Sequence, residues 1–160
     1  MSVTFAFLCL TMNGQKIVIV GIYISPNSHI DDIIAFLHGS LLRYTCDGGK
    51  LLPQRDDLKP LILTGDFIVN FTLDTFIKLT DFLQQQLNLQ MINDRNISTT
   101  KSGTTIDAVF SRYLDTIESR TYISYFSYHK PIVSTVAIAP ATQNVQAIEA
   151  PSNVQIIEIN

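Results

Sequence analysis

Four short segments carry side chains that could transfer a proton or activate water, and each lies at or near the end of a predicted strand. They are residues 23–27 (YISPN), 65–70 (GDFIVN), 105–110 (TIDAVF) and 127–132 (SYHKPI). Asp107 lies within an otherwise apolar run, where a carboxylate needs a partner or a solvated pocket. An aspartate–histidine pair beside a second carboxylate can activate water, because the first carboxylate fixes the imidazole tautomer. Asp66, Asp107 and His129 are therefore the candidate catalytic residues.

Each of these residues also has a structural interpretation. A single aspartate after a strand more often belongs to a turn or a helix cap. A histidine before a proline is usually structural or exposed, and Tyr23 alone fits a packed strand residue. The hypothesis of a catalytic site therefore depends on all four segments occurring together and in this order.

A β-hairpin is predicted at the start of the chain. Residues 3–11 and 16–24 are rich in β-branched and aromatic side chains. Asn13 and Gly14 between them both tolerate the positive φ of a tight turn. The run 17–22 is almost continuously apolar, which favours a strand covered on both faces.

Two amphipathic helices are predicted next. The first begins at Ser28, which has capping-box spacing to Asp31, and its apolar face comprises Ile30, Ile33, Ile34, Leu37, Leu41 and Leu42. The second spans residues 72–87, with Leu73, Phe76, Ile77, Leu83 and Leu87 facing inward. The polar segment 46–59 contains a Gly-Gly pair and is predicted to be a surface loop.

The remaining pattern defines the fold class. Further strands are predicted at 60–64, 89–92, 105–110, 121–126 and 132–138, with a polar loop at 93–103. The order β-β-α-β-α-β-β-β-β is a mixed α/β pattern. Residues 1–138 are predicted to form one domain. Residues 139–160 form a C-terminal tail, whose apolar run 154–159 either adds an edge strand or stays mobile.

Composition narrows the function classes. With 46% hydrophobic and 16% charged residues in 160, the chain can bury a core, which excludes a disordered protein. The net charge of −3 differs from the basic charge of a nonspecific nucleic-acid binder, but a bound cation can supply positive charge at a phosphate. Cys9 and Cys46 form neither a disulfide framework nor a zinc site. Without a signal peptide or a membrane-length apolar run, an intracellular location is expected, in nucleus or cytoplasm.

Taken together, the four segments resemble the C-terminal half of the endonuclease/exonuclease/phosphatase (DNase I-like) family. In that family a Tyr-x-x-Pro-Asn-like strand end precedes Gly-Asp-Phe-Asn, an Ile-Asp-x-x-Phe strand and Ser-Asp-His-x-Pro-Val. The match covers residues 18–136 and is similar to versions carried by mobile elements, including Helitron-type transposons, where Ser-Tyr-His-Lys-Pro can stand last. The resemblance implies part of a four-layer αββα sandwich, with mixed β-sheets flanked by helices.

The resemblance also implies a role for each matched residue. Asp66 matches the aspartate that orients or activates the attacking water, Asp107 the partner of the catalytic histidine, and His129 the histidine that contacts the scissile phosphate. Tyr23 matches a phosphate-side tyrosine, and Asn27 is expected to shape the same rim. The family uses Mg²⁺ or Mn²⁺, and nucleic acid is the expected partner.

The chain departs from the family pattern at three places. Ile68 replaces an Asn that binds phosphate, and Asn70 lies about 6–7 Å further along an extended chain, too far for a simple substitution. Tyr128 replaces a metal-side Asp. The family's N-terminal half supplies an Asn and the main metal-binding Glu, and this chain is expected to begin after them. Asn70 remains a candidate substrate-binding residue, the metal ligands are undetermined, and metal binding by this chain is expected to be weakened.

Two functions follow from these observations. One is metal-dependent hydrolysis of nucleic-acid phosphodiesters, impaired in this chain; the alternative is a non-catalytic remnant or interaction module that retains the fold. Nucleases, inositol-phosphate phosphatases and sphingomyelinases share these motifs, and the mobile-element likeness favours nucleic acid. One sheet face is expected to expose an apolar patch, which an N-terminal half or another chain would cover.

Overall fold

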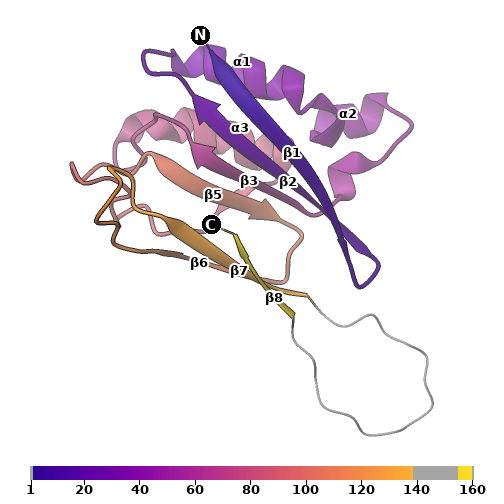
Figure 1. Ribbon diagram of the computed structural model, residues 1–160. Helices are drawn as coiled ribbons and strands as arrows, with labels where there is room; N and C mark the ends of the chain where they lie inside the picture. Colours follow the sequence, from indigo (N-terminus) through magenta and orange to yellow (C-terminus); the bar gives the residue numbers. More distant parts are fainter. Residues whose placement is uncertain (1, 139–154, 160) are drawn as a thin grey trace, which may run out of the picture.

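The computed structural model describes residues 2–138 and 155–159 as two stacked β-sheets with helices on one side (Figure 1). The larger sheet has the strand order β1-β2-β3-β5-β4 and the smaller sheet the order β6-β7-β8. The strands are β1 (Val3–Met12), β2 (Gln15–Ile24), β3 (Leu61–Asp66), β4 (Gln90–Met91), β5 (Asp107–Arg112), β6 (Thr116–Thr121), β7 (Ile132–Ile138) and β8 (Gln155–Ile159). Strand β8 pairs antiparallel with β7.

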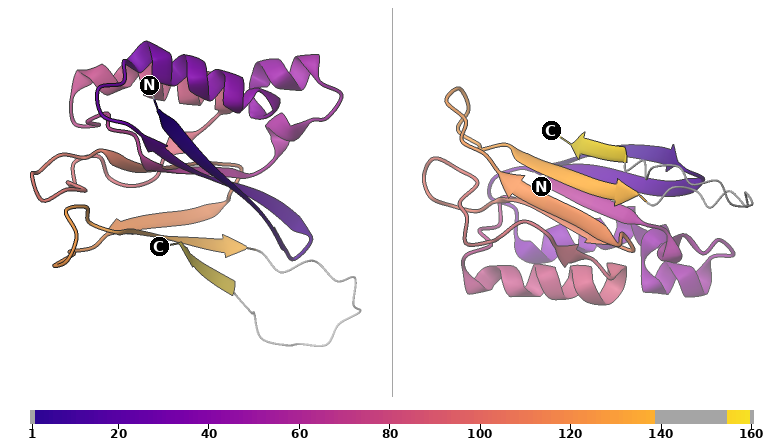
Figure 2. Two further views of the ribbon diagram at one scale, coloured as in Figure 1. Left: turned by 45° about the horizontal axis from the view of Figure 1, so that its top comes forward. Right: turned by 90° about the horizontal axis from the view of Figure 1, so that it is seen from below.

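The helices cover the face of the larger sheet that points away from the smaller sheet (Figure 2). They are α1 (Ile30–Ser40), α2 (Cys46–Leu51) and α3 (Ile77–Leu87), with 3₁₀ turns η1 (Leu42–Tyr44), η2 (Asp56–Leu58) and η3 (Asp74–Phe76). The described residues thus form three layers: helices, a five-stranded mixed sheet and a three-stranded sheet. This is the mixed α/β sandwich that the element order and the family resemblance predict. No helix among the described residues is long and apolar enough to cross a membrane.

The predicted hairpin is present, with β1 and β2 joined by two residues. Met12 pairs with Gln15 across the turn, and both central residues have positive φ, 50° at Asn13 and 80° at Gly14. Positive φ at both positions matches the right-handed twist of the flanking strands, and it is the geometry that an Asn-Gly pair adopts most readily.

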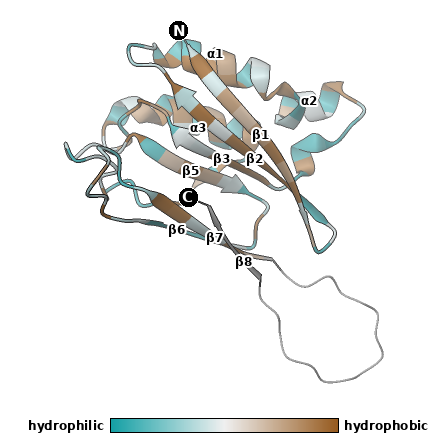
Figure 3. Cartoon of the chain, viewed as in Figure 1, coloured by the Kyte–Doolittle hydropathy of each residue, from teal (hydrophilic) through white to brown (hydrophobic). Residues whose placement is uncertain are grey.

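Strand β2 contributes to two hydrophobic cores, one on each face of the larger sheet. Val18, Val20 and Ile22 pack into the core under the helices, while Ile17 packs into the core between the sheets. The second core also contains Ile62 of β3, Val109 of β5 and Val136 of β7. The prediction of a strand covered on both faces is therefore confirmed. Figure 3 shows the hydrophobic residues running along β1 and β2.

The predicted helices are present, but their boundaries and inward faces differ in detail. Helix α1 begins at Ile30, so its N-cap residue is His29, which makes no side-chain cap, and Ser28 is not the cap; its hydroxyl donates to the carbonyl of Ser25 at 2.9 Å. In the second helix, Leu73 and Ile77 are 54% and 44% exposed, so their assignment to the inward face was wrong. The buried face comprises Phe76, Leu79, Leu83 and Leu87, spaced at three and four residues.

The prediction of a surface loop at 46–59 was wrong, because this segment contains α2 and η2. The Thr45 hydroxyl caps α2 by accepting a hydrogen bond from the Gly48 N–H at 2.9 Å. A Cβ at Gly48 would lie 1.8 Å from the carbonyl oxygen of Leu42. The glycine pair therefore reflects close packing, of Gly48 against η1 and of Gly49 against Asp57 in η2, not a flexible turn.

The predicted strand at 121–126 was also wrong, because the strand that pairs with β7 is β6 at 116–121. β6 alternates between exposed and half-buried residues, as expected for a strand with one face on the core. Its inward residue Ile117 packs against the core between the sheets. The aromatic residues that follow β6 lie in an exposed connection to β7 instead.

Strand β1 forms an edge of the larger sheet and exposes apolar side chains. Phe7 and Leu8 are each 53% exposed, and they lie on opposite faces of the strand. Exposed apolar residues at an open edge are the feature expected if another segment covers this part of the sheet. The identity of any covering segment stays a prediction.

Candidate active site

Three of the predicted site residues form a row across one end of the larger sheet. Tyr23 of β2 pairs in register with Asp66 of β3, and Asp66 pairs with Asp107 of β5. Paired residues on neighbouring strands point to the same face. That face also carries Ile62 and Val109, which pack between the sheets, so the row points toward the smaller sheet.

His129 reaches this row from the connection between β6 and β7. An isolated β-bridge pairs it with Thr100, and the backbone N–H of Lys130 donates to the carbonyl of Thr99 at 2.7 Å. On the other side of the bridge, the N–H of Lys101 donates to the carbonyl of Tyr128 at 3.0 Å. The loop at 99–101 therefore holds the backbone on both sides of His129.

The predicted contact between Asp107 and His129 is present. The Nδ1 of His129 lies 2.9 Å from Oδ2 and 3.1 Å from Oδ1 of Asp107, so an N–H at Nδ1 donates to that carboxylate. This tautomer leaves Nε2 facing Asp66, whose Oδ2 is 3.9 Å away. The imidazole is 40% exposed, whereas the carboxylates of Asp66 and Asp107 are 13% and 19% exposed.

The surroundings shift the protonation of two of these groups. The hydrogen bond to Asp107 raises the pKa of His129, the charges of Asp107 and Asp66 add to that effect, and burial opposes it. Burial raises the pKa of Asp66, the negative charge of Asp107 contributes, and the N–H of Ile68 and the charge of His129 oppose the rise. The site therefore favours a protonated imidazole next to a carboxylate that is unusually ready to take up a proton.

A glycine and a left-handed residue fix the backbone around Asp66. Gly65 has φ +142°, and a Cβ there would lie 1.9 Å from the carbonyl oxygen of Ile22 on the neighbouring strand. Two residues after Asp66, the Ile68 N–H donates to Asp66 Oδ1 at 3.0 Å. Ile68 has φ +57°, which is rare and unfavourable for a β-branched side chain.

Tyr128 lies beside His129 but does not supply a charge to the site. Its ring meets the imidazole edge to face, with centroids 5.5 Å apart, and its hydroxyl lies 2.5 Å from the Ser102 hydroxyl. The tyrosine is 52% exposed and links the His129 segment to the loop around Ser102.

The three residues predicted to contact substrate occupy different settings. Tyr23 is half exposed at the end of the Asp66 row. Asn27 is exposed in the turn after β2, where it follows Pro26 and has φ +68°, and no contact joins it to the Asp66 row. Asn70 Oδ1 accepts hydrogen bonds from the N–H of Thr72 at 3.2 Å and of Thr105 at 3.3 Å. The binding roles of Tyr23, Asn27 and Asn70 stay predictions.

Residues in the segment 93–103, which the sequence marks only as a polar loop, support the site. The Thr99 hydroxyl accepts from the N–H groups of Ile106 and Asp107, both at 3.1 Å. Asn93 is buried, and its Oδ1 accepts from the N–H of Val109 at 2.8 Å. These side chains hold the start of β5, and hence Asp107, in place. In the sequence, Asn93 and Thr99 are only polar residues of a polar loop, and composition does not reveal that they become buried.

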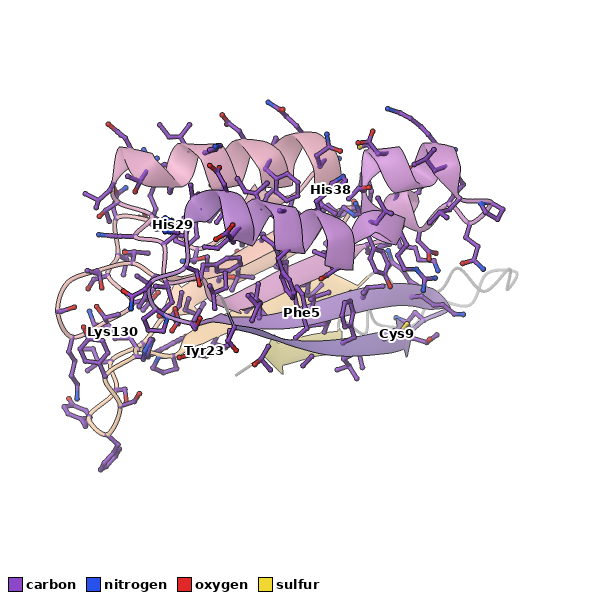
Figure 4. All side chains as sticks on the ribbon, turned by 90° about the horizontal axis from the view of Figure 1, so that it is seen from above. Phe5, Cys9, Tyr23, His29, His38 and Lys130 are labelled. Carbon is purple, nitrogen blue, oxygen red and sulfur yellow. The ribbon has the colours of Figure 1, made fainter. Side chains whose placement is uncertain are left out.

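A cavity of about 500 Å³ adjoins the Asp107–His129 pair. Its wall includes Gly21 of β2, Thr64 of β3, Ser127 and Lys130. Asp66 does not line this cavity, but its Oδ2 lies 3.9 Å from Nε2 of His129, which does. In Figure 4, Lys130 and Tyr23 lie toward one end of the sheets and Cys9 toward the other, so the candidate site belongs to a single end of the molecule.

Asp66, Asp107 and His129 also offer ligand atoms that lie within 4.8 Å of one another. Both oxygens of Asp107 face His129 Nδ1, and Asp66 Oδ1 accepts the Ile68 N–H. The atom best placed for a cation is therefore Asp66 Oδ2, because a protonated imidazole has no lone pair at Nε2. A single carboxylate suits Mg²⁺ or Mn²⁺, and either ion would keep most of its water ligands here. The residues fit a largely hydrated divalent cation.

Comparison with known proteins identifies the fold. No protein-family model and no curated protein matches the sequence. The structure is similar to the endonuclease domain of TRAS1, a telomere-specific non-LTR retrotransposon, with a TM-score of 0.63 and 20% identity over 82% of this chain. An endonuclease/exonuclease/phosphatase family protein from Bacteroides thetaiotaomicron has a TM-score of 0.49 at 14% identity over 82% of this chain, and SmcL has 0.48 at 12% over 96%.

The chain spans 61% of the TRAS1 domain and 54% of each of the other two structures. At these identities the similarity concerns the fold alone. The comparison rests on the TRAS1 domain, because its TM-score is above 0.5 and those of the other two structures are below it. The two sheets and the flanking helices agree with the architecture that the resemblance implies. The chain has the fold of the TRAS1 endonuclease domain, and this agrees with the fold that the endonuclease/exonuclease/phosphatase (DNase I-like) resemblance implies.

Proposed function

We propose that this chain carries the acid–base part of a nucleic-acid phosphodiesterase site, and that alone it hydrolyses phosphodiesters weakly. The observation that supports the proposal is the alignment of Asp107, His129 and Asp66. Asp107 orients the imidazole through Nδ1, and the opposite ring nitrogen faces a second carboxylate 3.9 Å away. An oriented, charge-supported histidine beside a carboxylate is a set that can move protons at a phosphate.

Each residue has a defined part in this proposal. His129, with its raised pKa, presents an N–H at Nε2 that can donate to a phosphate oxygen or protonate the leaving oxygen. Asp66 Oδ2 can orient a water molecule and accept its proton, and its raised pKa makes it a stronger base than an ordinary aspartate. Asp107 keeps the imidazole in the required tautomer and orientation.

A bound Mg²⁺ or Mn²⁺ would neutralise charge on the phosphate oxygens. The Asp66 carboxylate would help to hold it, and His129 Nε2 would keep its proton for the phosphate. The weak activity follows from the other positions of the motifs, where Ile68 and Tyr128 stand in place of a phosphate-binding amide and a carboxylate. Loss of one such charge-stabilising group can slow a reaction by about 10²–10³-fold.

Nucleic acid is the proposed substrate class. The TRAS1 domain is described as an endonuclease of a retrotransposon, which supports nucleic acid and an origin in a mobile element. Phosphoinositides and sphingolipids contain the same phosphodiester chemistry and are the competing substrates.

The test is a nicking assay on supercoiled plasmid with Mg²⁺ or Mn²⁺, at protein concentrations above that of the plasmid. We expect slow, metal-dependent nicking that His129→Ala and Asp66→Ala abolish. His38→Ala and Asp81→Ala are matched controls on the helix side, and they should nick like the wild type. Nicking that survives His129→Ala would contradict the proposal, and fast nicking by the wild type would contradict the impairment.

The second candidate function is a non-catalytic module that retains the fold. The contacts of Tyr128 favour this alternative. Tyr128 stands where the family motif has a carboxylate, and its hydroxyl bonds the Ser102 hydroxyl instead of offering a charge. A folded protein that shows no metal-dependent nicking would support this alternative over the first.

A further inference from the structure

The connection between β6 and β7 exposes an unusual set of apolar and aromatic side chains. Residues 122–128, here the aromatic loop, expose Tyr122 (49%), Ile123 (75%), Tyr125 (82%), Phe126 (102%) and Tyr128 (52%). The loop projects from one end of the molecule (Figure 2). Water-exposed apolar side chains that cluster in this way mark an interaction site more often than a simple chain reversal.

The aromatic loop is anchored at its base and braced along one side. The N–H of Tyr122 donates to the carbonyl of Pro131 at 2.9 Å, which closes the loop. Within it, the N–H of Ser127 donates to the Ser124 hydroxyl at 3.0 Å. The neighbouring segment braces it through the N–H of Lys101 to the Tyr128 carbonyl at 3.0 Å. A braced loop loses less conformational entropy when it binds a partner.

Positive charge accompanies these rings. The Lys101 ammonium donates to the carbonyl of Tyr125 at 3.3 Å, so it lies against the loop. Lys130 lines the cavity next to His129, and its ammonium donates to the Ser98 hydroxyl at 2.6 Å. Aromatic rings with lysines alongside match the composition of surfaces that stack on unpaired bases while contacting the phosphate backbone.

The loop is also directly connected to the candidate active site. Tyr128 precedes His129 in the sequence and meets its ring edge to face. Ser124 and Ser127 line the same cavity as Asp107 and His129. A strand whose phosphate lies at His129 would therefore bring its neighbouring bases to the aromatic loop.

We infer that the aromatic loop is a base-stacking platform, and that the substrate is single-stranded or locally unpaired nucleic acid. The inference rests on the proposed function for the choice of nucleic acid. Duplex DNA keeps its bases stacked on one another, so exposed rings gain little from it, whereas unpaired bases offer free faces. With an overall charge of −3, this chain attracts the phosphate backbone only weakly, so stacking on the loop would supply most of the affinity for a strand.

Binding of a phosphorothioate oligothymidine in EDTA tests the inference without requiring cleavage. The chain contains no tryptophan and six tyrosines, of which Tyr122, Tyr125 and Tyr128 lie in the loop, so stacking should quench a large part of the tyrosine fluorescence. Tyr125→Ala and Phe126→Ala should each weaken binding roughly 5- to 150-fold. Phe126→Trp should retain binding, and Phe7→Ala, an exposed ring on β1, should leave it unchanged.

Three results would overturn the inference. Binding that is unchanged in the Tyr125→Ala/Phe126→Ala double variant would exclude the loop. Tighter binding of a matched duplex than of the single strand would exclude base stacking. Loop-dependent binding to phosphatidylcholine–phosphatidylserine vesicles, without loop-dependent binding of the oligonucleotide, would assign the loop to a lipid surface. A protein that binds single strands through the loop but nicks no plasmid would contradict only the proposed function.

Discussion

Ile68 offers a direct test of how the chain compensates for an altered motif. The residue has φ +57°, a region that costs a β-branched side chain about 1–2 kcal/mol and that Asn tolerates well. Ile68 is also partly buried against the core under the helices. Full burial of an isoleucine contributes about 1.5–3 kcal/mol, so a partly buried one contributes about 1 kcal/mol.

These two effects are similar in size, so Ile68→Asn should change the free energy of unfolding by less than about 1 kcal/mol. Ile68→Ala supplies the control, because alanine loses the same packing but gains little tolerance for positive φ. The expected order of stability places the Asn variant above the Ala variant. Hydrophobicity alone predicts the reverse order, since Asn is the more polar side chain.

Urea denaturation of the three proteins at pH 7 measures both quantities. A loss of more than about 2 kcal/mol in Ile68→Asn, or an Asn variant that is less stable than the Ala variant, would refute the assignment of backbone strain at Ile68. The same variant should not restore fast nicking, because it returns one phosphate contact and no metal ligand. A large gain in nicking would show that the rest of the site is intact.

Two further predictions concern stability. Arg112→Met should lower the free energy of unfolding by about 3–5 kcal/mol in urea denaturation. The reason is that the buried guanidinium donates to four backbone carbonyls at 2.7–3.0 Å, those of Tyr44, Asp56, Lys59 and Leu87. Arg120→Met, at an exposed position, should cost little stability, and equal costs of the two substitutions would contradict this reasoning. Asp56→Asn should destabilise the protein at pH 7, because hydrogen bonds from Lys59 and Arg43 lower the pKa of Asp56 despite its burial. Because the pKa of Asp56 is lowered by folding, its stabilisation is present above the pKa of the unfolded state, near 4, and is lost as the pH falls further. The difference in unfolding free energy between wild type and Asp56→Asn should therefore narrow in acid. A difference that widens in acid would refute this prediction.

Much of the fold could be predicted because its signals are local. The Asn13-Gly14 turn, the doubly covered β2 and the buried β3 follow from residue type and from short continuous apolar runs. The errors occur where tertiary contacts override a local signal. The glycines at 48 and 49 indicate a loop, yet Gly48 permits close packing of a helix against Leu42. Residues 121–126 have strand composition, yet the preceding segment makes the pairing with β7.

The candidate site follows the same division. The pairing of Asp107 with His129 was predictable, because a carboxylate in an apolar strand needs a partner and the motif resemblance supplied one. The supporting roles of Thr99 and Asn93 were not, because their importance comes from hydrogen bonds to a strand that follows in the sequence. The strain at Ile68 was equally hidden, since a sequence shows the residue but not its φ.

The account depends above all on the pairing of His129 with Asp107, and nitrogen-15 NMR of the imidazole signals tests it most directly. We predict that His129 titrates above its ordinary value of 6.5 and carries its neutral-form proton on Nδ1. Asp107→Asn should lower the pKa of His129, because it removes the hydrogen-bonded charge that raises it. The signals of His29 and His38 should not differ between the two proteins. A His129 pKa at or below 6.5 in the wild type, or one that Asp107→Asn leaves unchanged, would contradict the proposed site.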